Sequence, residues 1–334
     1  KYKIEKRVVV SYWFEKRGLR RFRRIEMPVK LLVTPADPIK DREVFALGID
    51  YFPKTTKIRI KRHHQHLLYW IGHIQEQKEI LEPVFKKVVS AAELLGEAVV
   101  YIADGRNPLN DKVFASKILN YVKGIENIET LAEPAPKTYQ YFYEIEKKIS
   151  YNFKLLAISL RQSSRHHFHA AKSIKSVFKI DEMTHRFNQG KFQKIPLVQS
   201  IYHMNALVND YCDIFAELNK DYYLRDHPEE WQRLNVSISA GGFSCNFHKR
   251  FLPGRPLKTY LYLESSNRLM TVDTSFARNQ PNMSDLNELN AFYFDFPDPQ
   301  DQQFLELQIE RMQLEKVTQH CLNHRIKVSL GISE

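Results

Sequence analysis

The chain has 334 residues, and its 50 Lys and Arg outnumber 39 Asp and Glu, which leaves a net charge of +11. That length allows two or three domains with cores of their own. The charge predicts an anionic partner: nucleic acid, a nucleotide or a membrane surface. Three scattered cysteines without a CxxC pair indicate neither a disulfide framework nor a zinc site, and they favour a reducing compartment.

No apolar run approaches the roughly 18 residues of a membrane span, and no signal peptide is recognisable. We therefore expect a cytoplasmic protein without stable membrane insertion. Because the sequence opens at Lys1 in the middle of a pattern, we also expect a fragment of a longer protein.

The first half of the chain reads as a mixture of strands and helices. VVVSYWF, VKLLV, EVFALGIDYF and KIRI are short β-prone runs separated by Pro and charged turns. Helical spacing begins after His66, and AVVYIADG reads as a buried strand within it. We expect a strand and an arginine-rich arm over residues 1–28, then an N-terminal α+β domain over residues 29–137.

The segment LAEPAPK resembles a linker, and residues 138–222 are expected to form a mixed, mainly helical connecting region. In that region FKLLAISL reads as a strand and IYHMNALVNDYCDIFAEL as a helix.

Residues 223–334 change character. VSISAGGFSCNF, KTYLYLES, LMTVDTSFA and AFYFDF are strand-like runs at regular spacing, which is typical of a small antiparallel barrel or sandwich. A helix should follow, capped by Asp298 with Pro299 in its first position. Leu305, Ile309 and Met312 would lie on the face that covers the sheet. The predicted fold class is therefore α+β, with a C-terminal barrel and a closing helix.

Two short stretches point to a ligand. The first is LRRFRR, in which Arg20, Arg21, Arg23 and Arg24 precede the strand VKLLV. Such a run is commonly a solvated linker or a general phosphate patch. The specific alternative is guanine recognition, since arginine donates two hydrogen bonds to guanine, stacks on its face and neutralises phosphate.

The second stretch is VSISAGGF, which holds the only adjacent glycines, Gly241–Gly242. Strand alternation directs Val236 and Ile238 to the interior, and Ser237 and Ser239 toward solvent or a ligand. The glycines allow a positive φ or the close approach of a flat ligand. The alternative is a plain hairpin turn with exposed serines.

Together the two stretches resemble the PilZ family, bacterial receptors for cyclic di-GMP. Members carry an RxxxR arm before the first barrel strand and a D/N-x-S-x-x-G motif at a turn between the next strands. The resemblance covers about residues 230–320 well and 17–35 more weakly. Ser237 stands where the family has Asp or Asn, although Asn235 faces the same side. The resemblance implies ligand contacts by Arg20, Arg21, Arg23, Arg24, Asn235, Ser237, Ser239, Gly241 and Gly242.

The two half-motifs are usually a few dozen residues apart in the family, whereas here more than two hundred residues separate them. Three arrangements fit this spacing. The chain holds two PilZ-like domains, the N-terminal one degenerate, each with half a site; or residues 25–220 are an insertion in one split domain; or the site is degenerate and the barrel is an interaction module.

The resemblance implies a non-catalytic signalling effector that rearranges its domains when cyclic di-GMP binds, and that acts on a protein partner. The alternatives are an interaction module without a small ligand, or a nucleic-acid-binding protein that uses the basic segments KTTKIRIKRHH and SSRHHFHAAKSIK. No Walker loop, nucleophile elbow or HExxH is present, and Asp104 has no partner constellation. We expect neither an enzyme nor a metal site.

Overall fold

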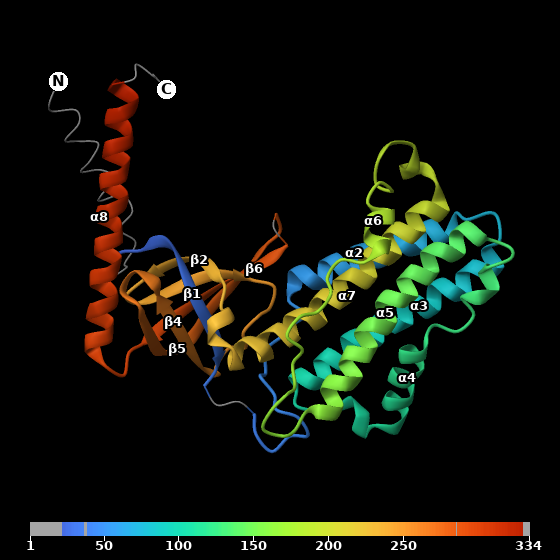
Figure 1. Cartoon of the computed structure of the whole chain (residues 1–334), viewed down its shortest axis with the longest axis horizontal. Helices are drawn as coiled ribbons and strands as arrows, with labels where there is room; N and C mark the ends of the chain where they lie inside the picture. The colour runs from blue at the N-terminus through green and yellow to red at the C-terminus, as the bar shows by residue number, and fades with distance from the viewer. Residues whose placement is uncertain (1–21, 37–38, 285, 330–334) are drawn as a thin grey trace.

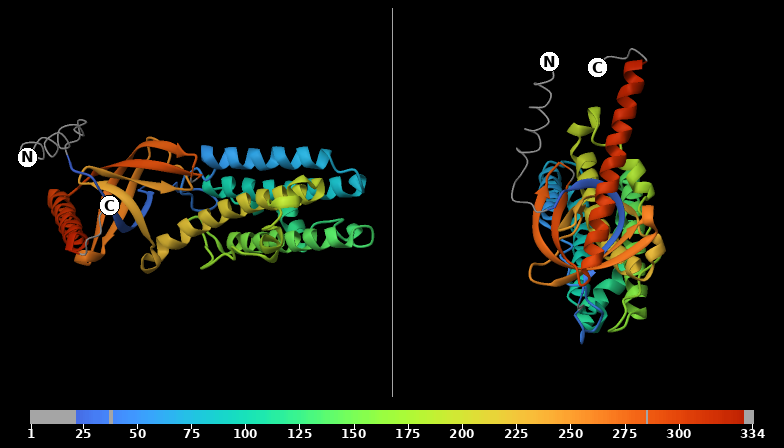
Figure 2. Two further views of the ribbon diagram at one scale, coloured as in Figure 1. Left: turned by 90° about the horizontal axis from the view of Figure 1, so that it is seen from above. Right: turned by 90° about the vertical axis from the view of Figure 1, so that its left-hand side faces the viewer.

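The computed structural model of the chain describes residues 22–36, 39–284 and 286–329 (Figure 1). The run VVVSYWF lies outside these residues. A small β-barrel and a bundle of long helices lie side by side, and a further helix stands at the end of the barrel away from the bundle (Figures 1 and 2).

The barrel is closed and antiparallel, with strands in the order β1-β2-β3-β6-β5-β4. This confirms the predicted fold class. The strands are β1 (Ile25–Pro35), β2 (Arg233–Ser239), β3 (Gly242–Phe247), β4 (Pro256–Leu263), β5 (Arg268–Asn282) and β6 (Asn287–Asp295).

Alternating side chains build the interior of the barrel. In β4, for example, Leu257, Thr259, Leu261 and Leu263 are buried and the residues between them are more exposed. Stacked aromatic rings fill the centre, where the ring centroids of Phe243 and Phe292 are 4.7 Å apart.

The closing helix α8 (Pro299–Ser329) follows β6 as predicted. The Asp298 carboxylate accepts a hydrogen bond from the Gln300 backbone N–H at 2.9 Å, which caps the helix. Leu305 and Ile309 are buried, and Met312 packs against the core from a partly exposed position. The helix covers the end of the barrel and extends past it (Figure 1).

The first strand belongs to the same barrel as the last five. β1 pairs with β2 through Ile25↔Ile238 and with β4 through Pro35↔Leu257. The expected domain boundary at residue 29 therefore falls inside β1. The barrel is thus split in sequence: residues 36–232 lie between β1 and β2, where the insertion considered from the sequence had covered residues 25–220. All six strands of the described residues belong to this one barrel.

The insertion is helical within the described residues. Its main helices are α2 (Lys54–Gly72), α3 (Lys78–Ala103), α4 (Lys112–Lys123), α5 (Pro136–Gln162), α6 (Lys179–Thr184) and α7 (Pro196–Asp226). Residues 36–137 of the expected α+β domain and the expected connecting region at 138–222 thus both supply helices to one bundle.

Four predicted strands in this region were wrong. KIRI lies in α2, AVVYIADG at the end of α3 and FKLLAISL in α5, while residues 43–52 form only isolated bridges. Helices buried on most sides carry continuous apolar runs that resemble buried strands. In α5 the spacing of Phe153, Leu156, Ala157 and Leu160, all buried, is that of one helical face.

Buried polar contacts join the bundle to the barrel. Glu288 of β6 is fully buried and accepts hydrogen bonds from the backbone N–H and hydroxyl of Thr55, at the start of α2. Lys249, after β3, contacts Asp221 of α7, whose other carboxylate oxygen accepts from the Tyr51 hydroxyl at 2.7 Å. Such groups are costly to bury unless they are paired, so these contacts fix how the bundle sits on the barrel.

Among the residues that the structure describes, no helix combines the length and apolarity needed to cross a membrane.

Candidate ligand-binding site

The described part of the arginine-rich arm lies against the β2–β3 hairpin. Arg24 Nη1 donates to Ser244 Oγ of β3 over 3.3 Å. The Phe22 ring covers Gly241, where an added Cβ would lie 2.9 Å from Phe22 Cδ2. Arg23 is exposed, and Arg20 and Arg21 lie outside the described residues. The closed barrel thus brings Arg24 beside the strand that follows the glycine pair.

The hairpin itself is tight. β2 ends at Ser239, which pairs with Gly242, so Ala240 and Gly241 form the turn. The Ser239 hydroxyl is buried and donates to the Gly242 carbonyl oxygen at 3.1 Å. Ser239 therefore supports the turn in this structure, whereas the sequence predicted that it faces solvent or a ligand.

Position 242 requires glycine because β3 and β6 approach each other closely there. Its φ is +151°, and a Cβ there would lie 2.1 Å from the Phe292 carbonyl oxygen of β6. No side chain fits in that space. The second glycine of the motif is thus explained by barrel packing.

The outward residues of β1, β2 and β3 form one polar surface. Ser237 lies between Glu26 of β1 and Ser244 of β3 in the strand register. Asn235 is exposed two positions earlier on β2, opposite Pro28. We call the surface formed by Arg24, Asn235, Ser237, Ser244 and Tyr293 the outer face.

Two members of the outer face, Ser244 and Tyr293, were not predicted from the sequence. Tyr293 of β6 lies opposite Gly242 in the register, and its side chain is 64% exposed. Alternation from Phe243 would have placed Ser244 on the outside. Tyr293 had no comparable signal, because its position depends on the pairing of β3 with β6.

The electrostatics of the outer face are mixed. Arg23 and Arg24 bring positive charge from the arm, and Lys316 of α8 donates to the Glu26 backbone carbonyl. The Glu26 side chain is exposed and adds one carboxylate. Arginine suits a phosphate, and a carboxylate accepts from the ring N–H and amino groups of a base.

The outer face offers several kinds of hydrogen-bond donor and acceptor. It combines guanidinium groups, hydroxyls, an amide and an exposed phenol ring, the set of groups that holds a planar polar anion. Across the described part of the chain, no three His, Cys, Asp or Glu side chains are grouped to hold a metal ion.

Comparison with known proteins adds little. No model of a known family matches the chain, and neither does any curated protein. One solved structure that it resembles is the inhibitor of motility MotI/DgrA from Bacillus subtilis, with 25% identity and a TM-score of 0.23. The match covers 26% of this chain and 44% of that one, less than half of its length. With so low a TM-score the similarity carries no argument about function.

Proposed function

We propose that the chain binds cyclic di-GMP on the outer face of the barrel. The observation that carries the proposal is the hydrogen bond from Arg24 to Ser244. It joins the arm that matches RxxxR to the strand that follows the SxSxxG turn, although the helical insertion separates the two in sequence. This contact between Arg24, the described end of the first half-motif, and the strand after the second supports a single shared site on the barrel.

Each part of the outer face has a role in this proposal. Arg20 and Arg24 bind phosphate and stack on guanine, with Arg21 and Arg23 adding charge. Asn235 and Ser237 form hydrogen bonds to guanine edges, and the bare backbone at Gly241, where Phe22 can move aside, admits the flat ligand.

Tyr293 completes the surface. Its exposed ring lies next to Gly242 and offers a face on which a base stacks. The Phe22 ring lies over Gly241. Ligand binding therefore either displaces this ring or stacks a base against it.

In this proposal the chain is a non-catalytic effector of the bacterial cytoplasm. The arm reorganises on the barrel when the dinucleotide binds, since a ligand shifts a conformational equilibrium through its differential contacts with the two states. The change passes through Glu288 and Lys249 to the helical insertion, which presents the altered surface to a protein partner.

Titration calorimetry with cyclic di-GMP tests the proposal. The variants are Arg20→Ala/Arg24→Ala and Ser237→Ala. The matched control is Arg186→Ala/Lys191→Ala, which removes two exposed cations that follow α6 in the helical insertion. We expect wild type and control to bind equally, Arg20→Ala/Arg24→Ala to lose binding, and wild-type affinity to fall with added salt, because exposed charges are screened.

Absence of binding by the wild type at several temperatures would reject the receptor function and favour the interaction module without a small ligand. Equal loss in Arg186→Ala/Lys191→Ala and Arg20→Ala/Arg24→Ala would show that net charge, and not the outer face, is responsible.

A further inference from the structure

Helix α2 is strongly basic and lies at the surface of the bundle (Figure 2). Its sequence KTTKIRIKRHHQHLLYWIG contains five Lys and Arg, three His and no acidic residue. Leu67 and Ile71 are buried on the inward side, and the helix packs on α7. Lys54, Lys57, Lys61 and Arg62 are exposed. The outward side of α2 therefore carries a row of cations, among which Ile58, Leu68 and Tyr69 are also exposed.

Most of these cations are not neutralised by the protein. Arg59 pairs with buried Asp210, and Lys57 reaches Asp50 only at 4.0 Å. Within the described part of the chain, Lys54, Lys61 and Arg62 have no carboxylate within ion-pair distance. A run of exposed, unpaired cations attracts an anion from solution.

The second basic segment noted in the sequence differs because some of its cationic groups have carboxylate partners within the protein. In SSRHHFHAAKSIK, His167 lies 3.4 Å from the Asp226 carboxylate and Lys172 lies 3.3 Å from Glu230. Internal partners thus take up part of its charge, and α2 is the better candidate surface for an anion.

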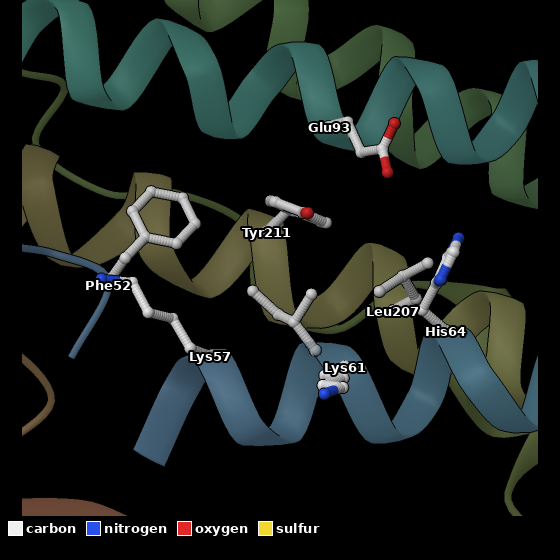
Figure 3. Close-up of a pocket in the computed structure, with 8 residues that line it drawn as sticks. Phe52, Lys57, Lys61, His64, Glu93, Leu207 and Tyr211 are labelled. Carbon is white, nitrogen blue, oxygen red and sulfur yellow. The ribbon is translucent and has the colours of Figure 1, made fainter. Parts of the chain in front are cut away.

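A cleft of about 260 Å³ opens beside these cations, between α2, α3 and α7 (Figure 3). Its apolar part is formed by Phe52, Ile60, Leu207 and the ring of Tyr211, and its polar rim by Lys57, Lys61 and His64 of α2 and Glu93 of α3.

The cleft has the shape and chemistry for a flat heteroaromatic ring. A Cβ at Gly96 would lie 2.6 Å from the Tyr211 ring, so a glycine is needed for that ring to occupy its place. An aromatic floor stacks on a base, and the Glu93 carboxylate across the cleft accepts from a base amino group, as acidic residues do from cytosine. The lysines on the rim meet phosphate.

More rings follow toward the end of α2. Tyr69 is 57% exposed. Its ring centroid lies 4.3 Å from that of His73 and 5.1 Å from that of Trp70. Tyr69 is about 7.5 Å along the helix axis from His64 on the cleft rim and, at 3.6 residues per turn, about 140° around the helix from it. A strand that passes over the cations of α2 can therefore place one base in the cleft and another, a few nucleotides along, on Tyr69.

We propose that the outward face of α2 and the adjoining cleft bind single-stranded nucleic acid. The exposed cations follow the phosphates, the cleft takes an unpaired base and Tyr69 stacks on another. This binding is separate from the dinucleotide site on the barrel and does not depend on it.

The geometry favours this partner over other polyanions. An anionic membrane calls for a continuous apolar face on the helix. α2 exposes Ile58, Leu68 and Tyr69, but these stand among its cations, and its other apolar residues pack into the bundle beside a concave cleft. A duplex keeps its bases stacked inside and has none to place in the cleft. A single strand offers both phosphates and free bases.

Fluorescence anisotropy with a labelled single-stranded RNA of twelve nucleotides and mixed sequence tests the proposal on the full chain. The same sequence as DNA, a duplex, and phosphatidylglycerol vesicles serve as further probes. The variants are Lys61→Glu/Arg62→Glu for the cations and Tyr69→Ala for stacking. The control is Lys112→Glu/Lys117→Glu on α4, which changes the net charge by the same amount. Helix α4 packs on α5, on another side of the bundle (Figure 1).

We expect the single strand to bind, and Lys61→Glu/Arg62→Glu to weaken it about tenfold or more and to reduce the slope of log affinity against log salt by about one per lost phosphate contact. Tyr69→Ala should weaken binding with that slope unchanged, and the α4 control should match wild type. All these side chains are exposed, so the thermal midpoint should stay the same.

Three outcomes would overturn the proposal: no binding of any single strand at low salt, equal loss in the α2 and α4 charge variants, or binding of duplex or vesicles in preference to the single strand. The last would assign the cations of α2 to a phosphate backbone alone or to a lipid surface.

Discussion

Arg24 and Ser244 are 220 positions apart in the sequence, and the guanidinium of Arg24 donates to the Ser244 hydroxyl over 3.3 Å. The contact exists because β1 lies next to β2 in the closed barrel, and β3 follows on the other side of β2. The helices inserted between β1 and β2 leave this pairing intact. An arm and a hairpin that look unrelated in the sequence therefore share one surface.

Restoring the family's residue at position 237 should strengthen cyclic di-GMP binding. Ser237→Asn adds a carboxamide on the outer face between Glu26 and Ser244, where it can pair with a guanine edge. One additional hydrogen bond is worth about 1 kcal/mol, so we expect affinity to rise about fivefold in calorimetry. Thr271→Asn on β5, which adds the same group on another side of the barrel, should have no effect. Unchanged affinity in Ser237→Asn would place the guanine edges elsewhere.

Removing the exposed ring of β6 should weaken the same ligand. Tyr293→Ala takes away a stacking surface beside Gly242, and base–aromatic stacking contributes about 1–3 kcal/mol. The thermal midpoint should stay near that of wild type, because Tyr293 is 64% exposed. Tyr262→Ala on β4 is the control, and equal weakening in both variants would count against a stacking role.

The two adjacent glycines should respond differently to substitution. Gly242→Ala places a Cβ 2.1 Å from a backbone oxygen at a φ of +151°, and we expect it to cost about 2–4 kcal/mol of unfolding free energy. At Gly241 the new Cβ meets only the Phe22 side chain, which can move aside. Gly241→Ala should therefore change stability by less than about 1 kcal/mol. Urea denaturation compares the two, and similar losses would contradict this account.

The barrel could be predicted from the sequence because each strand carries its own signal. The alternation in Leu257, Thr259, Leu261 and Leu263 and the turn residues between runs are local features. The pairing of β1 with β2 and β4 could not be predicted, since no local pattern shows which distant strand completes a barrel.

The candidate site follows the same division. Ser237 and its direction follow from alternation along one strand, whereas Tyr293 reaches the site through pairing across strands. The helix at residues 98–103 was missed for another reason. Ala98, Val99 and Ile102 are all fully buried, and a continuous apolar run in a bundle has the composition of a buried strand.

Two histidines in the bundle should make stability depend on pH. Burial, assisted by the positive charge of neighbours that include Arg62, lowers the pKa of His63 and of His203 to about 4. Their ring Nδ1 atoms are 3.3 Å apart. In the unfolded chain histidine titrates near 6.5. Both therefore favour the folded state fully above pH 6.5, and this contribution is lost as pH falls from 6.5 toward 4.

Asp210 acts in the opposite direction in nearly the same range. Burial outweighs its pairing with Arg59 and raises the pKa of Asp210 to about 6. Proton uptake by this carboxyl favours the folded state as pH falls from 6 to 4, which partly offsets the histidines.

His203→Gln should reduce the acid sensitivity of the fold. It removes one of the two depressed pKa values, so we expect the loss of unfolding free energy between pH 7 and pH 4.5 to shrink by up to about 3 kcal/mol. Urea unfolding at several pH values measures this. The exposed His169→Gln should keep the wild-type profile, and an unaltered profile in His203→Gln would show that His203 is not the titrating group.

Among the contacts between the barrel and the bundle, those of Lys249 should be the most sensitive to substitution. It is 5% exposed, contacts Asp221 and lies 3.4 Å from the Glu217 carboxylate. Burial alone would lower the pKa of Lys249, but the two carboxylates raise it overall, so the lysine is held charged. Lys249→Met leaves two carboxylates facing each other without a cation. Breaking a buried pair from one side costs about 3–5 kcal/mol.

Denaturation of Lys249→Met at pH 5 and pH 8 separates this charge effect from lost packing. The deficit should be larger at pH 8, because at pH 5 one of the abandoned carboxyls can take up a proton. Adding Asp221→Asn should recover part of the loss, since it removes one of the two unpaired charges. The exposed pair of Lys258 with Asp273, 3.9 Å apart, is the control: Lys258→Met should cost less than about 1 kcal/mol at either pH. A deficit in Lys249→Met that is the same at both pH values and is not reduced by Asp221→Asn would mean that Lys249 joins barrel and bundle by packing rather than by charge.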